Sequence, residues 1–318
     1  MSPKNRFAFF EGEIVPIEEA KVSIMTHALN YGTGAFGGIR AYWNDKDEEL
    51  YIFRVLEHFE RLLASAKMML MDLPYTKEDM ASILLRLLQA EGYRSDTYIR
   101  PLIYKSDPII GVKLNDLAGD FAMFAIPFGS YVDAEEGTRV AVSSWRRIND
   151  NSIPARGKFT GAYINSAFIK TEALLNGYDE ALVIDESGHV SEGSAENVFI
   201  VRKDKLITPP VNADILEGIT RRTIMHLVSE EMGLEVIERP IDRTEFYVAD
   251  EAFFCGTGVQ VAAIIEVDQR PVGNGKMGPM VEALRNLYFR VVRGQHPAYK
   301  HWSTPVYASQ TAPTPATD

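Results

Sequence analysis

The sequence predicts an α+β protein made of two lobes, and three observations support this prediction. The chain has 318 residues, which is enough for two ordinary domains with cores of their own. In some segments apolar residues recur at helical spacing, while others are short runs rich in β-branched and aromatic residues. These helices and strands alternate irregularly, which favours an α+β arrangement over a doubly wound parallel sheet.

The first lobe is predicted to be a small α+β domain over residues 1–128. Amphipathic helices are expected at residues 56–70 and 76–92, where the Thr76 hydroxyl can cap the second helix and Gly92 can end it. Extended runs follow at residues 98–104 and 121–126. The polar, glycine-bearing segment 129–137 is the predicted connection between the lobes.

The second lobe is predicted over residues 138–303. Its expected strands are 139–144, 181–184 and 197–201, its expected helices are 161–175, 220–232 and 279–292, and a hairpin turn is expected between Val201 and Leu206. The stretch that begins at Ser303 is rich in proline and threonine and has no apolar face. We therefore expect residues 304–318 to form a disordered tail.

Charge and cysteine content limit the possible partners and location. The formal net charge of -11 argues against binding to nucleic acid or to an anionic membrane, since both require clustered lysine and arginine. A single cysteine, Cys255, cannot form a disulfide within the chain. The N-terminal apolar run is too short for a signal peptide, and no window is long and apolar enough to cross a bilayer. We therefore expect a cytoplasmic protein.

Several familiar site patterns are weak in this chain. His296 and His301 lack the spacing of a helical ligand pair, so no metal site is expected. Residues 273–278 match a dinucleotide fingerprint by letters, but they lie too near the C-terminus for a full strand–helix–strand unit, and a turn is favoured. Cys255 has no recognisable base beside it and is expected to be a small buried hydrophobic residue.

Lys158 is the candidate nucleophile. No acidic residue occurs within four positions of it, and Arg156 adds a like charge, which together would lower the pKa of the amine. Only a neutral amine attacks a carbonyl, so such a lysine suits Schiff-base chemistry. On pattern alone, a solvated surface lysine remains the alternative.

Three further segments could surround an anionic ligand. Residues 191–197 place two acids among small residues, residues 216–220 open a helix whose free N–H groups suit a phosphate, and residues 256–258 offer further amides and a hydroxyl. Taken alone, each of them could equally be an ordinary turn.

These four segments, in this order and together with residues 25–40, resemble the branched-chain aminotransferases, which are fold-type IV enzymes that use pyridoxal 5'-phosphate (PLP). The matching segments also include residues 57–62, 98–102, 143–145 and 215–221. The resemblance covers nearly all of the chain except the tail. It implies the two-lobed fold of the D-amino acid aminotransferase type.

The resemblance also implies a cofactor site. Lys158 would hold PLP covalently and, once displaced by the substrate, would move the substrate's proton. Glu192 would pair with the pyridine nitrogen and keep it protonated, and Tyr163 would lie near the phenolic oxygen. The phosphate would be held by Arg61, by the backbone at Ile219 and Thr220, and by Thr257.

The substrate site implied by the resemblance is largely aromatic. Its walls would be Tyr31, Phe36, Tyr98, Phe128 and Tyr131, with Arg100 facing them and Thr257 and Gly258 near the α-carboxylate. Arg100, with Tyr31 and Tyr131, would bind the distal carboxylate of glutamate. A salt bridge from Arg100 to an acid elsewhere in the chain is the structural alternative.

The predicted reaction is ping-pong transamination of leucine, isoleucine and valine with 2-oxoglutarate. Gly37 stands where the family usually has glutamate, which leaves the substrate range open. Transamination of D-amino acids or (R)-amines, or aminodeoxychorismate lyase activity, are the alternatives within the same fold. A silent binding protein is the alternative of another class, but Lys158 and Glu192 are both present. Relatives build each site from two protomers, so at least a homodimer is expected.

Overall fold

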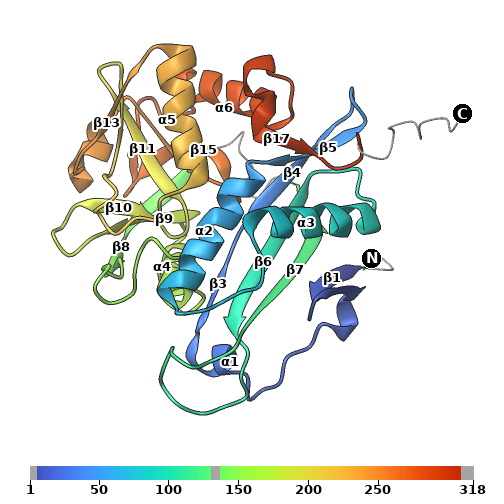
Figure 1. Ribbon diagram of the computed structural model, residues 1–318. Helices are drawn as coiled ribbons and strands as arrows, with labels where there is room; N and C mark the ends of the chain where they lie inside the picture. Colours follow the sequence, from blue (N-terminus) through green and yellow to red (C-terminus); the bar gives the residue numbers. More distant parts are fainter. Residues whose placement is uncertain (1–5, 130–136, 309–318) are drawn as a thin grey trace, which may run out of the picture. The chain divides into compact units, whose positions relative to one another are not determined.

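The structure is a computed structural model that describes residues 6–129 and 137–308 (Figure 1). The chain divides into two compact units, Met1–Gly129 with Arg290–Asp318, and Ser130–Phe289. Of the predicted connecting segment 129–137, only Gly129 and Gly137 are described, and Tyr131 lies outside the described residues.

The first unit is built on an antiparallel sheet. In the order β17-β5-β4-β6-β7-β1-β2, with β3 paired to β6, its strands are β17 (Ser303–Pro305), β5 (Glu49–Phe53), β4 (Ile39–Asn44), β6 (Thr97–Lys105), β7 (Gly119–Pro127), β1 (Phe7–Phe10), β2 (Glu13–Pro16) and β3 (Gly34–Phe36). Alternate residues of β6 are buried, because one face of the strand meets the core. Tyr98 and Arg100 lie on its other, half-buried face.

Two helices cover one face of this sheet, α2 (Val55–Met68) and α3 (Lys77–Glu91), as Figure 1 shows. α3 begins with a capping box in which Thr76 and Asp79 satisfy each other's backbone N–H groups, and Gly92 ends it in the left-handed conformation. The helices predicted from periodicity are therefore confirmed. The remaining helical segments of the unit are short: η1 (Ile17–Glu19), α1 (His27–Tyr31) and η3 (Pro297–Trp302).

The prediction of a disordered tail from residue 304 is wrong for its first part. Ser303–Pro305 is strand β17, which pairs with β5, and Val306 is fully buried. The carboxylate of Glu49 accepts hydrogen bonds from the backbone N–H groups of Val306, Tyr307 and Ala308. Composition missed this segment because both its strand pairing with β5 and its hydrogen bonds to Glu49 involve residues distant in the sequence. The division of the chain also places residues 290–303 with the first unit, although they were predicted to belong to the second lobe.

The second unit is built on a mixed sheet. In the order β10-β9-β8-β15-β14-β11-β12-β13, with β16 paired to β15, its strands are β10 (Val190–Gly193), β9 (Glu180–Ile184), β8 (Thr138–Arg146), β15 (Gln260–Val267), β14 (Glu251–Gly256), β11 (Asn197–Arg202), β12 (Lys205–Thr208), β13 (Glu235–Glu238) and β16 (Arg270–Pro271). Pairing is parallel at β8–β9, β8–β15 and β12–β13 and antiparallel elsewhere. The predicted hairpin after Val201 is the β11–β12 turn.

Both faces of the second sheet are covered by apolar side chains. On β9, Ala181 and Val183 pack against α4 (Tyr163–Leu175), whereas Leu182 joins the main core on the opposite face. The other helices are α5 (Ile219–Met232), α6 (Pro279–Val292) and η2 (Arg243–Val248). The mixture confirms the predicted α+β class. Among the described residues, no helix combines the length and the apolarity needed to cross a membrane.

Candidate active site

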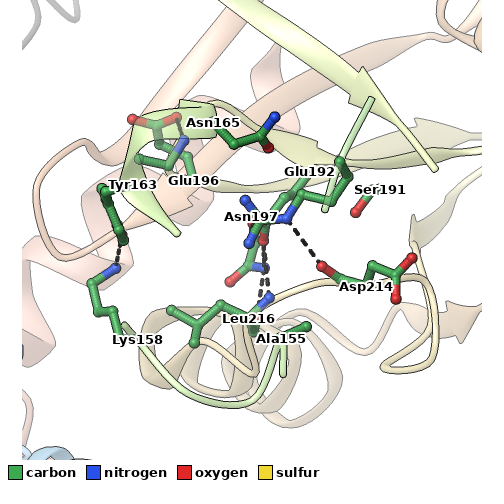
Figure 2. A network of polar contacts seen from close by, with 12 residues as sticks. Ala155, Lys158, Tyr163, Asn165, Ser191, Glu192, Glu196, Asn197, Asp214 and Leu216 are labelled. Atoms are coloured by element: carbon green, nitrogen blue, oxygen red, sulfur yellow. Dashed lines mark hydrogen bonds and ion pairs between the residues drawn. The ribbon is translucent and has the colours of Figure 1, made fainter. Parts of the chain in front are cut away.

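Lys158 and Tyr163 face each other at the start of α4 (Figure 2). Lys158 lies in the loop between β8 and α4, and Tyr163 is the first residue of the helix. The Lys158 Nζ donates a short hydrogen bond to the Tyr163 hydroxyl and lies 4.9 Å from the centre of its ring. The helix therefore fixes a hydroxyl beside the candidate nucleophile.

Arg156 is less important to Lys158 than the sequence indicated. Its guanidinium lies 3.4 Å from an Asp150 carboxylate oxygen and 3.1 Å from one of Glu217. These two acids compensate its charge, so Arg156 is a weak source of repulsion toward Lys158.

Glu192 is a buried carboxylate with three protein partners. Its Oε1 lies 2.8 Å from Arg147 Nη2, while its Oε2 accepts hydrogen bonds from Leu216 N at 3.1 Å and Asn197 Nδ2 at 3.3 Å. Burial raises the pKa of the Glu192 carboxyl, and the positive charge of Arg147 is the strongest influence in the opposite direction. A carboxylate accepts about four hydrogen bonds, so room remains for one more donor.

Side chains from β10, from β11 and from the residue that follows β8 hold the loop before α5. Ser191 Oγ donates to the carbonyl of Ala213 at 2.6 Å, and Arg147 Nε donates to that of Asp214 at 3.1 Å. Asn197 Nδ2 donates to the carbonyl of Leu216 at 2.9 Å. Figure 2 shows Glu192, Asn197 and Leu216 next to one another in this network of polar contacts.

The N-terminus of α5 has the features of an anion site. Its N-cap is Gly218, which supplies no side-chain cap, and its first turn holds no acidic residue. Ile219 and Thr220, the predicted phosphate-binding residues, are the first two residues of the helix. Free N–H groups and the helix dipole both favour a negative ligand there.

Thr257 and Gly258 form the turn between β14 and β15. β14 is joined to the Glu192 segment through β11, since Asn197 pairs with Cys255, two residues before Thr257. Cys255 itself is fully buried, and burial raises the pKa of its thiol, so it is the packing residue that the sequence predicted.

In the first unit, a second cluster surrounds Arg100. Its guanidinium lies 4.5 Å from the ring centre of Phe36 and donates to the Tyr98 hydroxyl, with an Nη2–Oη distance of 2.9 Å. The rings of Tyr98 and Phe128 are 5.5 Å apart. Among the described residues Arg100 has no carboxylate partner, so the alternative of a salt bridge finds no support there.

Two other predicted residues of the first unit, Tyr31 and Arg61, have contacts of their own. Tyr31 packs beside His27 and accepts a hydrogen bond from the Gly111 N–H at 3.1 Å. Arg61 lies on α2, half-buried, one turn before Ser65, whose hydroxyl donates to its carbonyl.

The sequence reasoning missed Arg147, Asn197 and Arg40. The first two reach Glu192, and Arg40 donates to the Gly129 carbonyl at 2.7 Å while lying 5.0 Å from the Phe128 ring centre. The residue types alone could have indicated them, because an arginine or an asparagine that becomes buried needs hydrogen-bond partners. In the described part of the chain, no group of acidic, histidine and cysteine side chains is arranged to hold a metal.

The sequence of this chain matches a known protein family. The sequence model of the family Amino-transferase class IV matches residues 34–267. The chain belongs to the class IV aminotransferases. It is 50% identical over 301 residues to a probable branched-chain-amino-acid aminotransferase from Aquifex aeolicus, covering 95% of this chain and 97% of that protein.

Solved structures of class IV aminotransferases agree with this membership. The branched-chain aminotransferase from Thermoproteus uzoniensis, crystallised with norvaline, has a TM-score of 0.91 at 44% identity, covering 95% of this chain and 100% of that one. The branched-chain amino acid aminotransferase from Thermobaculum terrenum, in its PLP-bound holo-form, has a TM-score of 0.91 at 39% identity, covering 96% and 99%. The predicted family and its fold-type IV architecture are therefore confirmed.

Proposed function

We propose that this protein transfers the amino group of the branched-chain L-amino acids leucine, isoleucine and valine to 2-oxoglutarate, using PLP in a ping-pong reaction. The observation that carries the proposal is the second unit's arrangement of Lys158 against Tyr163, with a buried Glu192 and an uncapped helix start. Family membership and relatives named for this reaction support it.

The residues of the second unit fit PLP. Glu192 is a buried acid with capacity for one more donor, which suits a protonated pyridine nitrogen. The α5 N-terminus, at Ile219 and Thr220, suits the phosphate, and Thr257 offers a hydroxyl nearby in the fold. Arg61 is the further phosphate ligand that we propose in the first unit.

When bound, PLP supplies a ring that accepts the electron pair released at the substrate carbon. Lys158 would hold the cofactor through its side-chain amine, and its Nζ would take the proton from the substrate Cα. Tyr163 orients that amine through its hydroxyl. Glu192 holds the proton at the ring nitrogen, for which it must be an anion.

We propose that the Arg100 cluster receives the substrate side chain. Phe36, Tyr98 and Phe128 offer apolar ring faces for a branched chain, and the Arg100 guanidinium offers a partner for the distal carboxylate of glutamate. Tyr31 and Tyr131 are proposed to contribute hydroxyls, and Thr257 and Gly258 to meet the α-carboxylate.

Trapping tests the proposal directly. Reduction of the purified holoprotein with borohydride, followed by peptide mapping, should place a phosphopyridoxyl group on Lys158. Steady-state assays should show turnover of L-leucine with 2-oxoglutarate, and Lys158→Ala should abolish it. An unmodified Lys158, or turnover of D-alanine without L-leucine, would contradict the proposal.

We also propose that the protein is at least a homodimer. Ile164, Phe168 and Leu175 leave one side of α4 exposed, and Trp145 stacks on Phe168 with ring centres 4.8 Å apart. An exposed apolar stripe of this kind is typical of an association surface. Light scattering should give at least twice the mass of the chain, and Phe168→Glu should reduce it.

A cytoplasmic location belongs to the same proposal, supported by one buried cysteine that needs no oxidising compartment. Fractionation of the source cells should place the protein with cytoplasmic markers.

A further inference from the structure

Asn197 is linked to three of the segments that we assign to the cofactor. Its Nδ2 donates to Glu192 Oε2 at 3.3 Å and to the carbonyl of Leu216 at 2.9 Å, three residues before α5 begins. Its backbone pairs with Cys255, which leads directly into the turn of Thr257.

The position of Asn197 leaves little freedom. The residue is 6% exposed and is the first of strand β11. A Cβ at Gly218 would lie 2.1 Å from Asn197 Oδ1, so the N-cap of α5 must be glycine for the asparagine to keep this place. The amide is therefore packed directly against the start of the helix.

Other side chains hold the same loop, but at points farther from the helix. Ser191 holds the carbonyl of Ala213 and Arg147 holds that of Asp214. Asn197 holds the Leu216 carbonyl and at the same time donates to Glu192, whose Oε2 also accepts directly from the Leu216 N–H at 3.1 Å, so the amide adds a second link between the carboxylate and this loop.

We propose that Asn197 is a positioning residue that couples the Glu192 carboxylate to the N-terminus of α5, and so fixes the spacing between the acid for the ring nitrogen and the site for the phosphate. The inference rests on the proposed function, because it assigns those two ends to one cofactor. A primary amide suits the task, since one nitrogen carries two donor hydrogens for two acceptors. An aspartate would place an oxygen against both acceptors, and an alanine would leave both without this donor.

The test compares readouts from the two ends in the full-length protein. Binding of inorganic phosphate to the protein freed of PLP reports the helix end. The pH midpoint of the visible absorption of the holoprotein reports the ring end. The variants are Asn197→Ala, the isosteric Asn197→Asp, Thr257→Ala, which removes the hydroxyl assigned to the phosphate, and Thr208→Val as a matched control. Thr208 is also fully buried, and its hydroxyl donates to the Val198 carbonyl at 2.9 Å, so its loss tests the removal of any buried hydrogen bond near β11.

Asn197→Ala and Asn197→Asp should each weaken phosphate binding about tenfold and shift the absorption midpoint, although neither phosphate nor the ring nitrogen is assigned to Asn197. Thr257→Ala should weaken phosphate binding without moving the midpoint, and Thr208→Val should change neither readout.

An Asn197→Asp protein that folds and alters one end only, or neither, overturns the inference, as does an equal effect of Thr208→Val. The proposed function fails separately: in that case the wild-type protein itself yields no phosphopyridoxyl group on Lys158 after reduction.

Discussion

At the scale of single residues, Arg147 favours the negative charge on Glu192, whereas burial opposes it. Its Nη2 lies 2.8 Å from Glu192 Oε1, and its charge is the strongest influence that lowers the pKa of this carboxyl. Arg147→Met removes that influence, so the pKa of Glu192 should rise further. Because the reaction needs the anion, the acidic limb of the pH profile of kcat/KM for L-leucine should move to higher pH.

Arg147→Lys is the control for this prediction. It keeps the positive charge and loses the planar, two-pronged geometry, so its acidic limb should lie between those of the wild type and Arg147→Met. If the limb stays in place in Arg147→Met while activity falls evenly at every pH, Arg147 does not act through Glu192.

Gly38 permits the contact between Tyr98 and Arg100. A Cβ at Gly38 would lie 2.7 Å from the Tyr98 hydroxyl oxygen, which accepts the hydrogen bonds of Arg100. Gly38→Ala should therefore displace this pair and raise KM for 2-oxoglutarate about tenfold, with a smaller rise for L-leucine.

Gly129→Ala is the matched control for Gly38→Ala, because a Cβ there meets no atom of the described residues within 4 Å. It should leave both KM values unchanged. Equal rises in KM for the two substrates in Gly38→Ala would mean that Arg100 does not serve the distal carboxylate.

The sequence could predict residues whose type is tied to the chemistry, such as Lys158 and Glu192, because they stand in family motifs. It could not predict Arg147 and Asn197 as site residues. Both contact Glu192 only in the folded chain: Arg147 directly follows β8, and Asn197 begins β11.

At the scale of elements, the sequence signals that lie within the element itself were the ones that predicted structure reliably. α3 has its capping box and its glycine stop within the printed sequence, and the structure confirms both. Ser303–Pro305 has no such signal, because its strand forms only through pairing with β5. Interactions distant in sequence are therefore what the prediction lacked.

Glu245 joins three elements of the second unit and gives a prediction about pH. Glu245 lies in η2. It accepts a hydrogen bond at 2.7 Å from Nη2 of Arg239, which follows β13, and one at 2.6 Å from Nη1 of Arg202, which lies in β11. Hydrogen bonds from Arg239 are the largest cause that lowers its pKa, to about 2. A carboxyl whose pKa is lowered by folding stabilises the folded state at pH values above its ordinary pKa. This stabilisation is lost as the pH falls toward 2.

Glu245→Gln should lower the free energy of unfolding by about 2 kcal/mol at pH 7, measured with urea, and by clearly less at pH 3. Glu235→Gln is the control, since its ion pair with Lys205 is exposed and should contribute little at either pH. A loss for Glu245→Gln that is equal at pH 7 and pH 3 would exclude the titration of Glu245 as the cause.

At the scale of the whole molecule, the chain returns at its end to the unit in which it began. Residues 290–308 complete the first unit, and β17 forms an edge of its sheet beside β5. Two ion-pair contacts hold the return at its start, with Arg293 Nη2 lying 2.8 Å and Nη1 3.0 Å from the two carboxylate oxygens of Asp96. Composition alone could not show that a late segment belongs to an early domain.

The last described residues depend on Glu49, which is 5% exposed and accepts from the N–H groups of Val306, Tyr307 and Ala308 at 2.7 to 3.0 Å. Glu49→Ala removes the side-chain acceptor of the Tyr307 and Ala308 N–H groups and one of the two acceptors of the buried Val306 N–H, which also donates to the Leu50 carbonyl at 3.0 Å, and should cost about 2 kcal/mol in the free energy of unfolding. Amide hydrogen exchange at the three residues should accelerate, because β17 would open more readily from β5. Glu18→Ala, at an exposed position on η1, is the control and should change neither measurement. Unchanged exchange at Val306 in Glu49→Ala would show that pairing with β5 alone, without the carboxylate, retains the returning segment.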